Sequence, residues 1–128
     1  MGLGATNKRK GSSAERGYAK VFRDLGFTFC KTSREGSRVH DNAGIDLINI
    51  PLNVQIKAGY PRGLNQSKEL AYISDKVKEL FPPGDKEHTL PKVLIHKKNV
   101  GRGIKRTEFD EIVSMTMEDF IRILKLKI

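Results

Sequence analysis

The stretch GIDLINIPLNVQIKAGY, residues 44–60, decides the fold of this chain. Its apolar residues continue on both sides of a turn at residues 51–53, which predicts a β-hairpin. Because strand side chains alternate between the two faces of a sheet, Gln55 and Lys57 share one face of the second strand, and the residues between them face the core. The apolar register brings Asp46, on the first strand, close to both. A carboxylate, an amide oxygen and an ammonium at one place favour divalent-metal chemistry on phosphate.

Helices and further strands are predicted around this hairpin. Ser12 and Glu15 form a capping box, and apolar residues then recur at helical spacing until Gly26. The expected order is close to αβββαββα, an α/β fold. The remaining elements are a strand at 27–31, a polar loop at 32–44, strands at 45–50 and 53–58, a helix carrying Leu70, Ile73, Val77 and Leu80 and ended by Pro82, a strand at 92–96, a basic turn to residue 106, a strand at 111–115, and a helix opened by Thr116 and Asp119 with Phe120, Ile123 and Leu124 toward the core.

Length and composition limit the classes of protein to which this chain can belong. The 128 residues predict one domain, residues 12–128, behind a flexible basic tail, residues 1–11. The net charge of +9 favours a polyanionic partner, and nucleic acid is the first expectation. No apolar run has the length of a secretion signal or a membrane span, and a single cysteine, Cys30, excludes an internal disulfide. We therefore expect a soluble cytoplasmic protein with no membrane contact and no organic cofactor.

Four segments together resemble a known superfamily: the glutamate-bearing helix SSAERGYAKVFRDLGF, the Ser/Arg loop after it, the strand GIDL and the strand ending QIK. They are similar to the PD-(D/E)xK nucleases, and most similar to Holliday junction resolvase-like endonucleases of archaeal and phage type. The resemblance covers residues 10–60 and, more loosely, IHKKN and MTMEDF. It implies a restriction-endonuclease-like core, with a central mixed β-sheet flanked by helices, that hydrolyses phosphodiester bonds. It also implies a homodimer that places two active sites on branched DNA, in the host cytoplasm if the chain is phage-encoded.

The resemblance also implies roles for individual residues. Mg²⁺ would be the cofactor, with Mn²⁺ able to substitute. Asp46 would be the central metal ligand, Gln55 the second and the Ile56 carbonyl a third, while Glu15 would complete the site from the helix. Lys57 would orient the attacking water and stabilise charge in the transition state. Gln55 departs from the usual glutamate and removes a negative charge, which Asp41 could restore if its loop folds back, and Gly44 and Ile45 stand where a proline is usual. Ser33 and Ser37 lie in the loop where resolvases keep a catalytic serine, and the sequence leaves open which of them matches.

Basic side chains predict the contacts to duplex or branched DNA. No aromatic platform for stacked single-stranded bases is evident, so the phosphate backbone is the expected target. The candidates are Lys8, Arg9 and Lys10 in the tail, Arg34 and Arg38 in the polar loop, and Lys97, Lys98, Arg102, Lys105 and Arg106 in the basic turn. The apolar face of the helix at 70–80 is the expected dimer contact.

Other interpretations remain open at this point. One alternative makes Glu15 a helix-capping residue only. Another makes Lys57 a structural ion-pair partner of Asp46. His40 and His96 are left out of the catalytic set. One alternative function is another nuclease of the superfamily, acting on linear, nicked or flapped DNA. The other is a catalytically inactive DNA-binding accessory protein, for which Gln55 would be the mark of lost activity.

Overall fold

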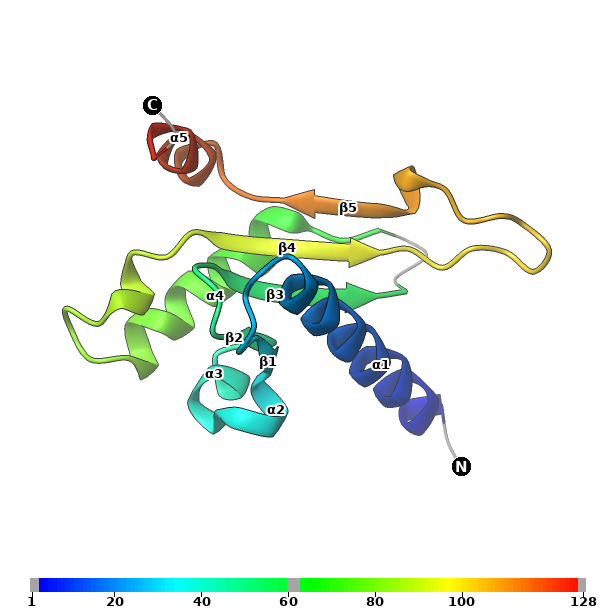
Figure 1. The fold of residues 1–128 in the computed structure, drawn as a ribbon, viewed down its shortest axis with the longest axis horizontal. Coiled ribbons are helices and arrows are strands. Elements are labelled where there is room, and N and C mark those ends of the chain that lie inside the picture. Colours follow the sequence, from blue (N-terminus) through cyan, green and yellow to red (C-terminus); the bar gives the residue numbers. More distant parts are fainter. Residues whose placement is uncertain (1–2, 60–62, 127–128) are drawn as a thin grey trace.

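The computed structural model describes residues 3–59 and 63–126, with side chains from residue 12 onward. Its centre is a five-stranded mixed sheet in the order β1-β2-β3-β4-β5, with helices packed against it (Figure 1). None of the helices in these ranges combines the length and the apolar character that a membrane crossing requires. The elements are α1 (Leu3–Asp24), β1 (Lys31–Thr32), α2 (Ser33–Gly36), α3 (Arg38–Asn42), β2 (Leu47–Ile48), β3 (Asn53–Ala58), α4 (Gln66–Leu80), η1 (Lys86–His88), β4 (Lys92–Lys97), η2 (Glu108–Asp110), β5 (Glu111–Ser114) and α5 (Met117–Lys125).

The predicted hairpin is present, and it leads into a parallel pair of strands. β2 lies antiparallel to β3, with Leu47 opposite Val54. β3 and β4 run parallel over their whole length, and α4 provides the crossover that a parallel pair requires. β5 returns antiparallel to β4 and is the last strand on its side of the sheet. The α/β class with a mixed sheet is thus as the sequence predicts.

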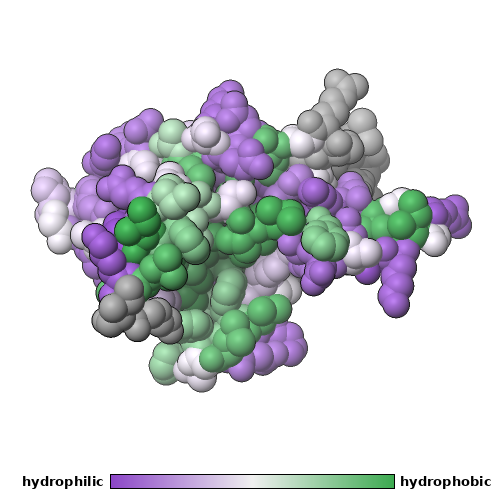
Figure 2. All heavy atoms as spheres, turned by 90° about the horizontal axis from the view of Figure 1, so that it is seen from above, coloured by the Kyte–Doolittle hydropathy of each residue, from purple (hydrophilic) through white to green (hydrophobic). Residues whose placement is uncertain are grey.

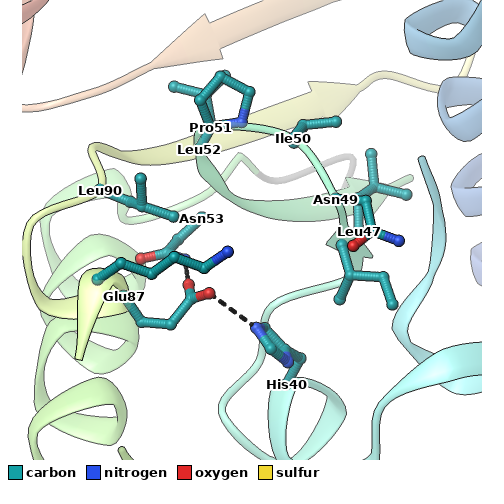
Figure 3. A pocket seen from close by; sticks show the side chains of 11 residues that line it. His40, Leu47, Asn49, Ile50, Pro51, Leu52, Asn53, Glu87 and Leu90 are labelled. Carbon is teal, nitrogen blue, oxygen red and sulfur yellow. Dashed lines mark hydrogen bonds and ion pairs between the residues drawn. The ribbon is translucent and has the colours of Figure 1, made fainter. Parts of the chain in front are cut away.

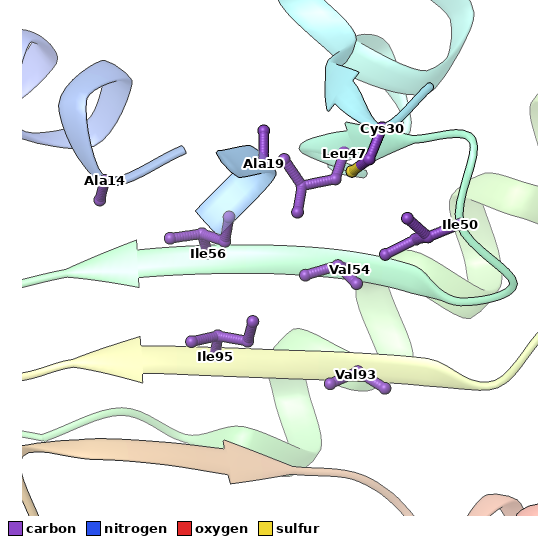
Figure 4. Packing of buried hydrophobic residues seen from close by; sticks show 9 residues of the cluster. All are labelled: Ala14, Ala19, Cys30, Leu47, Ile50, Val54, Ile56, Val93 and Ile95. Carbon is purple, nitrogen blue, oxygen red and sulfur yellow. The ribbon is translucent and has the colours of Figure 1, made fainter. Parts of the chain in front are cut away.

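Both faces of the sheet carry a core. On one face, Val54 and Ile56 of β3 pack with Ala14 and Ala19 of α1 (Figure 4). On the other, α4 contributes Ile73 and Val77 to a second cluster with Ala43, Ile45 and Phe81. The alternation along β3 therefore places Gln55 and Lys57 on the α4 side. Since α4 covers that side, Gln55 is buried rather than open to solvent.

The N-terminal helix begins earlier than predicted. α1 starts at Leu3, so Ser12 and Glu15 lie inside it and the predicted capping box at Ser12 is wrong. Ala5 and the Lys8–Lys10 segment are compatible with a helix, and Gly11 alone does not stop it. α1 ends as expected before Gly26, whose φ of 117° suits a glycine. The flexibility of the tail, residues 1–11, stays a prediction.

The loop predicted at 32–44 contains two short helices, α2 and α3. Ser37 caps α3, because its Oγ accepts a hydrogen bond from the His40 backbone N–H. The strand predicted at 27–31 is displaced to Lys31–Thr32, and the first hairpin strand is only two residues long. Several other elements agree with prediction: β3, β4, β5 and α4 lie where the pattern places them, and the Thr116 side chain accepts from the Asp119 N–H at the start of α5.

Two expectations about apolar faces are wrong. Phe120 and Leu124 of α5 are each 46% exposed and do not fill the core. Leu70, Ile73 and Val77 of α4 are buried within the chain, so the face of α4 expected at a dimer contact is not available to a partner. Helical periodicity identifies an apolar stripe, but it does not say what the stripe packs against.

Candidate active site

Asp46 lies where β2 begins and is fixed by three hydrogen bonds. Its backbone N–H donates to the Val54 carbonyl at 2.7 Å, and its carbonyl accepts from the Ser33 N–H at 2.9 Å. Its side-chain Oδ2 accepts from the Ile56 N–H at 2.7 Å. Burial raises the pKa of the Asp46 carboxyl to about 7, although the Ile56 N–H lowers it. Asp46 is thus a largely desolvated carboxyl group aimed at the edge of β3.

Gln55 and Ile56 are the two residues of β3 that carry the other predicted oxygen ligands. In an extended strand the N–H and C=O of one residue point to the same side, so the Ile56 carbonyl lies on the Asp46 side of β3. Gln55 is 6% exposed, and its buried Oε1 has no hydrogen-bond partner among the described residues. A buried amide oxygen without a partner costs free energy unless a ligand or water completes it.

Gly44 determines how closely the loop approaches Gln55. Its φ is 78°, and a Cβ at this position would lie 3.1 Å from Gln55 Nε2 and 3.2 Å from the Tyr72 ring. A glycine here satisfies both the left-handed backbone and the close approach. The glycine at position 44 therefore has a structural reason in this chain.

Glu15 reaches the site from α1 and pairs with Arg34 of α2. Arg34 Nε lies 3.0 Å from Glu15 Oε2, and Arg34 Nη2 donates to Oε1 at 3.2 Å. Burial raises the pKa of Glu15, and the Arg34 guanidinium partly offsets this. Glu15 in turn raises the pKa of Asp46, so the two carboxyl groups are close enough to repel. Arg34, expected at DNA phosphate, has Glu15 as a partner within the chain.

Lys57 brings a second cation to the same place. Its ammonium lowers the pKa of Asp46, and its Nζ lies 3.8 Å from Glu69 Oε2 on α4. Both side chains of that ion pair are about one quarter exposed. Asp46 is thus close enough to both Glu15 and Lys57 to feel their charges, and α4 adds Glu69. Nothing in the sequence points to Glu69, because its position depends on how α4 packs.

The structure separates the two candidate serines. Ser33 donates its backbone N–H to Asp46, is buried, and has an Oγ without a partner among the described side chains. Ser37 Oγ instead lies 2.6 Å from His40 Nδ1 and caps α3. Asp41 also approaches the site, because its carboxylate raises the pKa of Glu15. The loop thus folds back toward Glu15, as the sequence allowed.

His40 fastens this loop to the body of the protein. Its Nε2 lies 3.1 Å from Glu87 Oε1, and Glu87 Oε2 accepts from Asn53 Nδ2 at 2.5 Å (Figure 3). The three side chains line one side of a pocket of about 390 Å³, whose other walls include Leu47 and Leu90. This network joins α3, η1 and the start of β3, and it holds the segment that carries Ser33 and Arg34.

Three of the predicted DNA-binding side chains line a second hollow. The hollow has a volume of about 480 Å³ and is lined by Lys97, Lys98 and Arg106, together with Ser13 and Ala58. Ser13 belongs to α1 and Ala58 to β3, the two elements that also carry Glu15 and Lys57. Arg38, Arg102 and Lys105 are exposed elsewhere on the surface. The side chains of Lys8, Arg9 and Lys10 lie outside the described residues.

The oxygen donors at this site suit a hard cation, but the site carries little net negative charge. Asp46, Glu15, the Gln55 amide and the Ile56 carbonyl are all oxygen donors, the type that Mg²⁺ prefers. No group of three or more His, Cys, Asp or Glu side chains suited to a metal occurs in the described parts of the chain. Two carboxyl groups also face two cations, Arg34 and Lys57. The unpartnered Gln55 oxygen is the feature that most favours an added ligand.

Comparisons of the chain with protein-family models, curated proteins and solved structures find no match.

Proposed function

We propose that the chain is a Mg²⁺-dependent DNA endonuclease with a restriction-endonuclease-like core. The observation that carries the proposal is the desolvated Asp46 carboxyl, hydrogen-bonded to the Ile56 N–H of β3. Gln55, the residue before Ile56, has a buried side-chain oxygen that lacks a partner among the described residues. If Asp46 were purely structural, partners that stabilise its charge would be expected. Instead, burial raises the pKa of Asp46 to about 7. The element order and the QIK strand motif support assignment to the PD-(D/E)xK superfamily.

Each residue has a defined task in this proposal. Asp46, Gln55, the Ile56 carbonyl and Glu15 would hold the cation. When bound, the cation would polarise the phosphoryl group and supply a bound water as the nucleophile. Lys57 orients that water and places a positive charge beside the phosphate, where the P–O bond to the leaving oxygen breaks as the new P–O bond forms. Ser33 would be the serine of the site rather than Ser37, because the Ser33 Oγ has no partner among the described residues whereas Ser37 Oγ is engaged with His40.

The preferred substrate is a four-way DNA junction, cut by a symmetric dimer. Two opposed strands of a junction require two active sites related by a two-fold axis, which a homodimer provides. The hollow lined by Lys97, Lys98 and Arg106 supports binding to the DNA backbone. The Arg34–Glu15 pair and Gln55 favour the second candidate, an inactive DNA-binding protein, because both reduce the negative charge available to a metal.

A cleavage assay tests the proposal. A labelled four-way junction and a linear duplex of matched sequence are incubated with Mg²⁺ or Mn²⁺ and the wild type, Asp46→Asn, Lys57→Ala or the control Lys20→Ala. Lys20 forms an exposed ion pair with Asp24 on α1, so its loss should not affect cutting. We expect junction cleavage by the wild type and the control only. Equal cutting of the linear duplex would favour another nuclease of the superfamily, junction binding without cutting would favour the inactive protein, and cutting by Asp46→Asn would refute the site.

A further inference from the structure

The outer surface of α5 is unusual for a helix on a monomer. Met117, Phe120, Ile121 and Leu124 recur at the i, i+3, i+4, i+7 spacing of one helix face, yet they are 70%, 46%, 43% and 46% exposed. In an ordinary surface helix such a stripe faces the core. Here the apolar stripe faces largely outward.

Polar residues attach α5 to the body of the protein instead. Asp119 Oδ2 accepts from the Lys92 N–H at the start of β4, at 2.9 Å. Arg122 pairs with Asp119 at 2.8 Å and also donates to the Thr89 carbonyl. Asp119 and Arg122 lie opposite the apolar stripe at 100° per residue. The helix is therefore fixed by its polar side, and its orientation directs the apolar stripe away from the chain.

Exposed apolar side chains also occur on β5, the edge strand that precedes α5. Ile112 and Val113 of β5, which point to opposite faces of the sheet, are 37% and 57% exposed. β5 is the end of the strand order, so within residues 3–59 and 63–126 no further strand pairs with its outer edge. Figure 2 looks onto this side of the molecule, and apolar residues form a band across it. We call the six residues Ile112, Val113, Met117, Phe120, Ile121 and Leu124 the β5–α5 surface.

We propose that the β5–α5 surface is the contact between two copies of this chain. At about 200 Å² for a large apolar residue, the six residues together with Phe109 and Leu126 expose about 900 Å² in total. That total is comparable to the share of one partner in a standard stable interface. An exposed apolar area of this size suits the core of a homodimer interface rather than a contact to DNA.

The edge of β5 favours a second copy over another partner. Two β5 strands related by a two-fold axis pair antiparallel, and this continues the sheet from one copy into the other. With the axis at Ile112 or Val113, Glu111 faces an apolar residue of the second copy and does not meet its own equivalent. The pairing thus brings apolar side chains together without opposing like charges.

This inference locates the dimer of the proposed function but does not rest on nuclease activity. Its test measures molecular mass and crosslinking, so its failure leaves the cleavage assay unaffected. Sedimentation equilibrium and light scattering of the full chain should give a dimer. Val113→Lys and Ile121→Lys should each raise the dissociation constant at least about tenfold. The control is Val39→Lys, on α3 near the opposite edge of the sheet, where the side chain is 38% exposed. Circular dichroism confirms that each variant is folded.

Cysteine crosslinking tests the geometry. Equivalent residues on the two-fold axis of an antiparallel pair have Cα atoms about 4.5–5.5 Å apart, within the range of a disulfide. Val113→Cys or Ile112→Cys should therefore form a dimer on non-reducing gels after mild oxidation, whereas Val39→Cys should not. The native Cys30 is buried, so the wild type should not form a disulfide-linked dimer and serves as a control. A monomeric wild type, or a dimer insensitive to both lysine variants, would overturn the proposal. A monomeric wild type that floats with vesicles of phosphatidylserine and phosphatidylcholine would also overturn the proposal.

Discussion

Replacing Asp46 with asparagine should stabilise the metal-free protein at neutral and alkaline pH. Burial raises the pKa of Asp46 from 3.8 to about 7. At about 1.36 kcal/mol per pH unit, the ionised carboxylate costs the folded state up to about 4 kcal/mol, and we expect about 2–4 kcal/mol after relaxation. Asparagine removes the charge, and its Oδ1 can still accept the hydrogen bond from the Ile56 N–H.

The pH dependence follows from the direction of this shift. The folded chain holds the Asp46 proton to a higher pH than the unfolded chain does, so wild-type stability falls as pH rises between about 4 and about 7. The gain in Asp46→Asn should be near zero below about pH 4, grow through that window and then level off. Urea unfolding with a chelator, from about pH 4.5 to about pH 8, measures it. The exposed Asp24→Asn is the control, with a difference within about 0.5 kcal/mol.

Two outcomes would refute this reasoning. A difference between Asp46→Asn and wild type that stays flat across the pH range would show that Asp46 is not a desolvated carboxyl. Added Mg²⁺ should stabilise the wild type, and more at alkaline pH, but not the asparagine variant, because a cation that binds only the folded state shifts unfolding by mass action. Equal stabilisation of both proteins by Mg²⁺ would place the cation elsewhere.

Three further substitutions test the surroundings of Asp46. Gln55→Glu adds a buried charge, so it should lower metal-free stability and strengthen Mg²⁺ binding about tenfold by calorimetry; unchanged affinity would remove Gln55 from the metal site. Gly44→Ala should cost about 1–3 kcal/mol in urea unfolding, because of its φ of 78° and the close approach of Gln55 and Tyr72. Arg34→Ala leaves Glu15 buried without its cation and should cost about 1–3 kcal/mol at neutral pH. That loss should shrink at acidic pH, where Glu15 is protonated, and a constant loss would contradict the pairing.

The elements that the sequence predicts well are those with strong local patterns. β3 and β4 are short apolar runs bounded by turns, and α4 has apolar residues at helical spacing before Pro82. The Thr116 cap acts within one helical turn, so its signal is visible in the sequence. The alternation along β3 also placed Gln55 and Lys57 on one face. All of these features depend on contacts between residues that are close in the chain, and the periodicity of the sequence reports such contacts directly.

Tertiary packing decided the rest, because the partner of a side chain can lie far away in sequence. Glu15 pairs with Arg34 across 19 residues, and His40 is held by Glu87 across 47 residues. The second of the two short helices in the predicted loop, α3, carries His40 and is stabilised partly through that contact. The sequence alone determined an α/β chain with an acid, an amide and a lysine on one hairpin. Only the folded structure buried Asp46 and left an oxygen of Gln55 unpaired, and it turned the apolar side of α5 outward, since burial depends on which elements pack together.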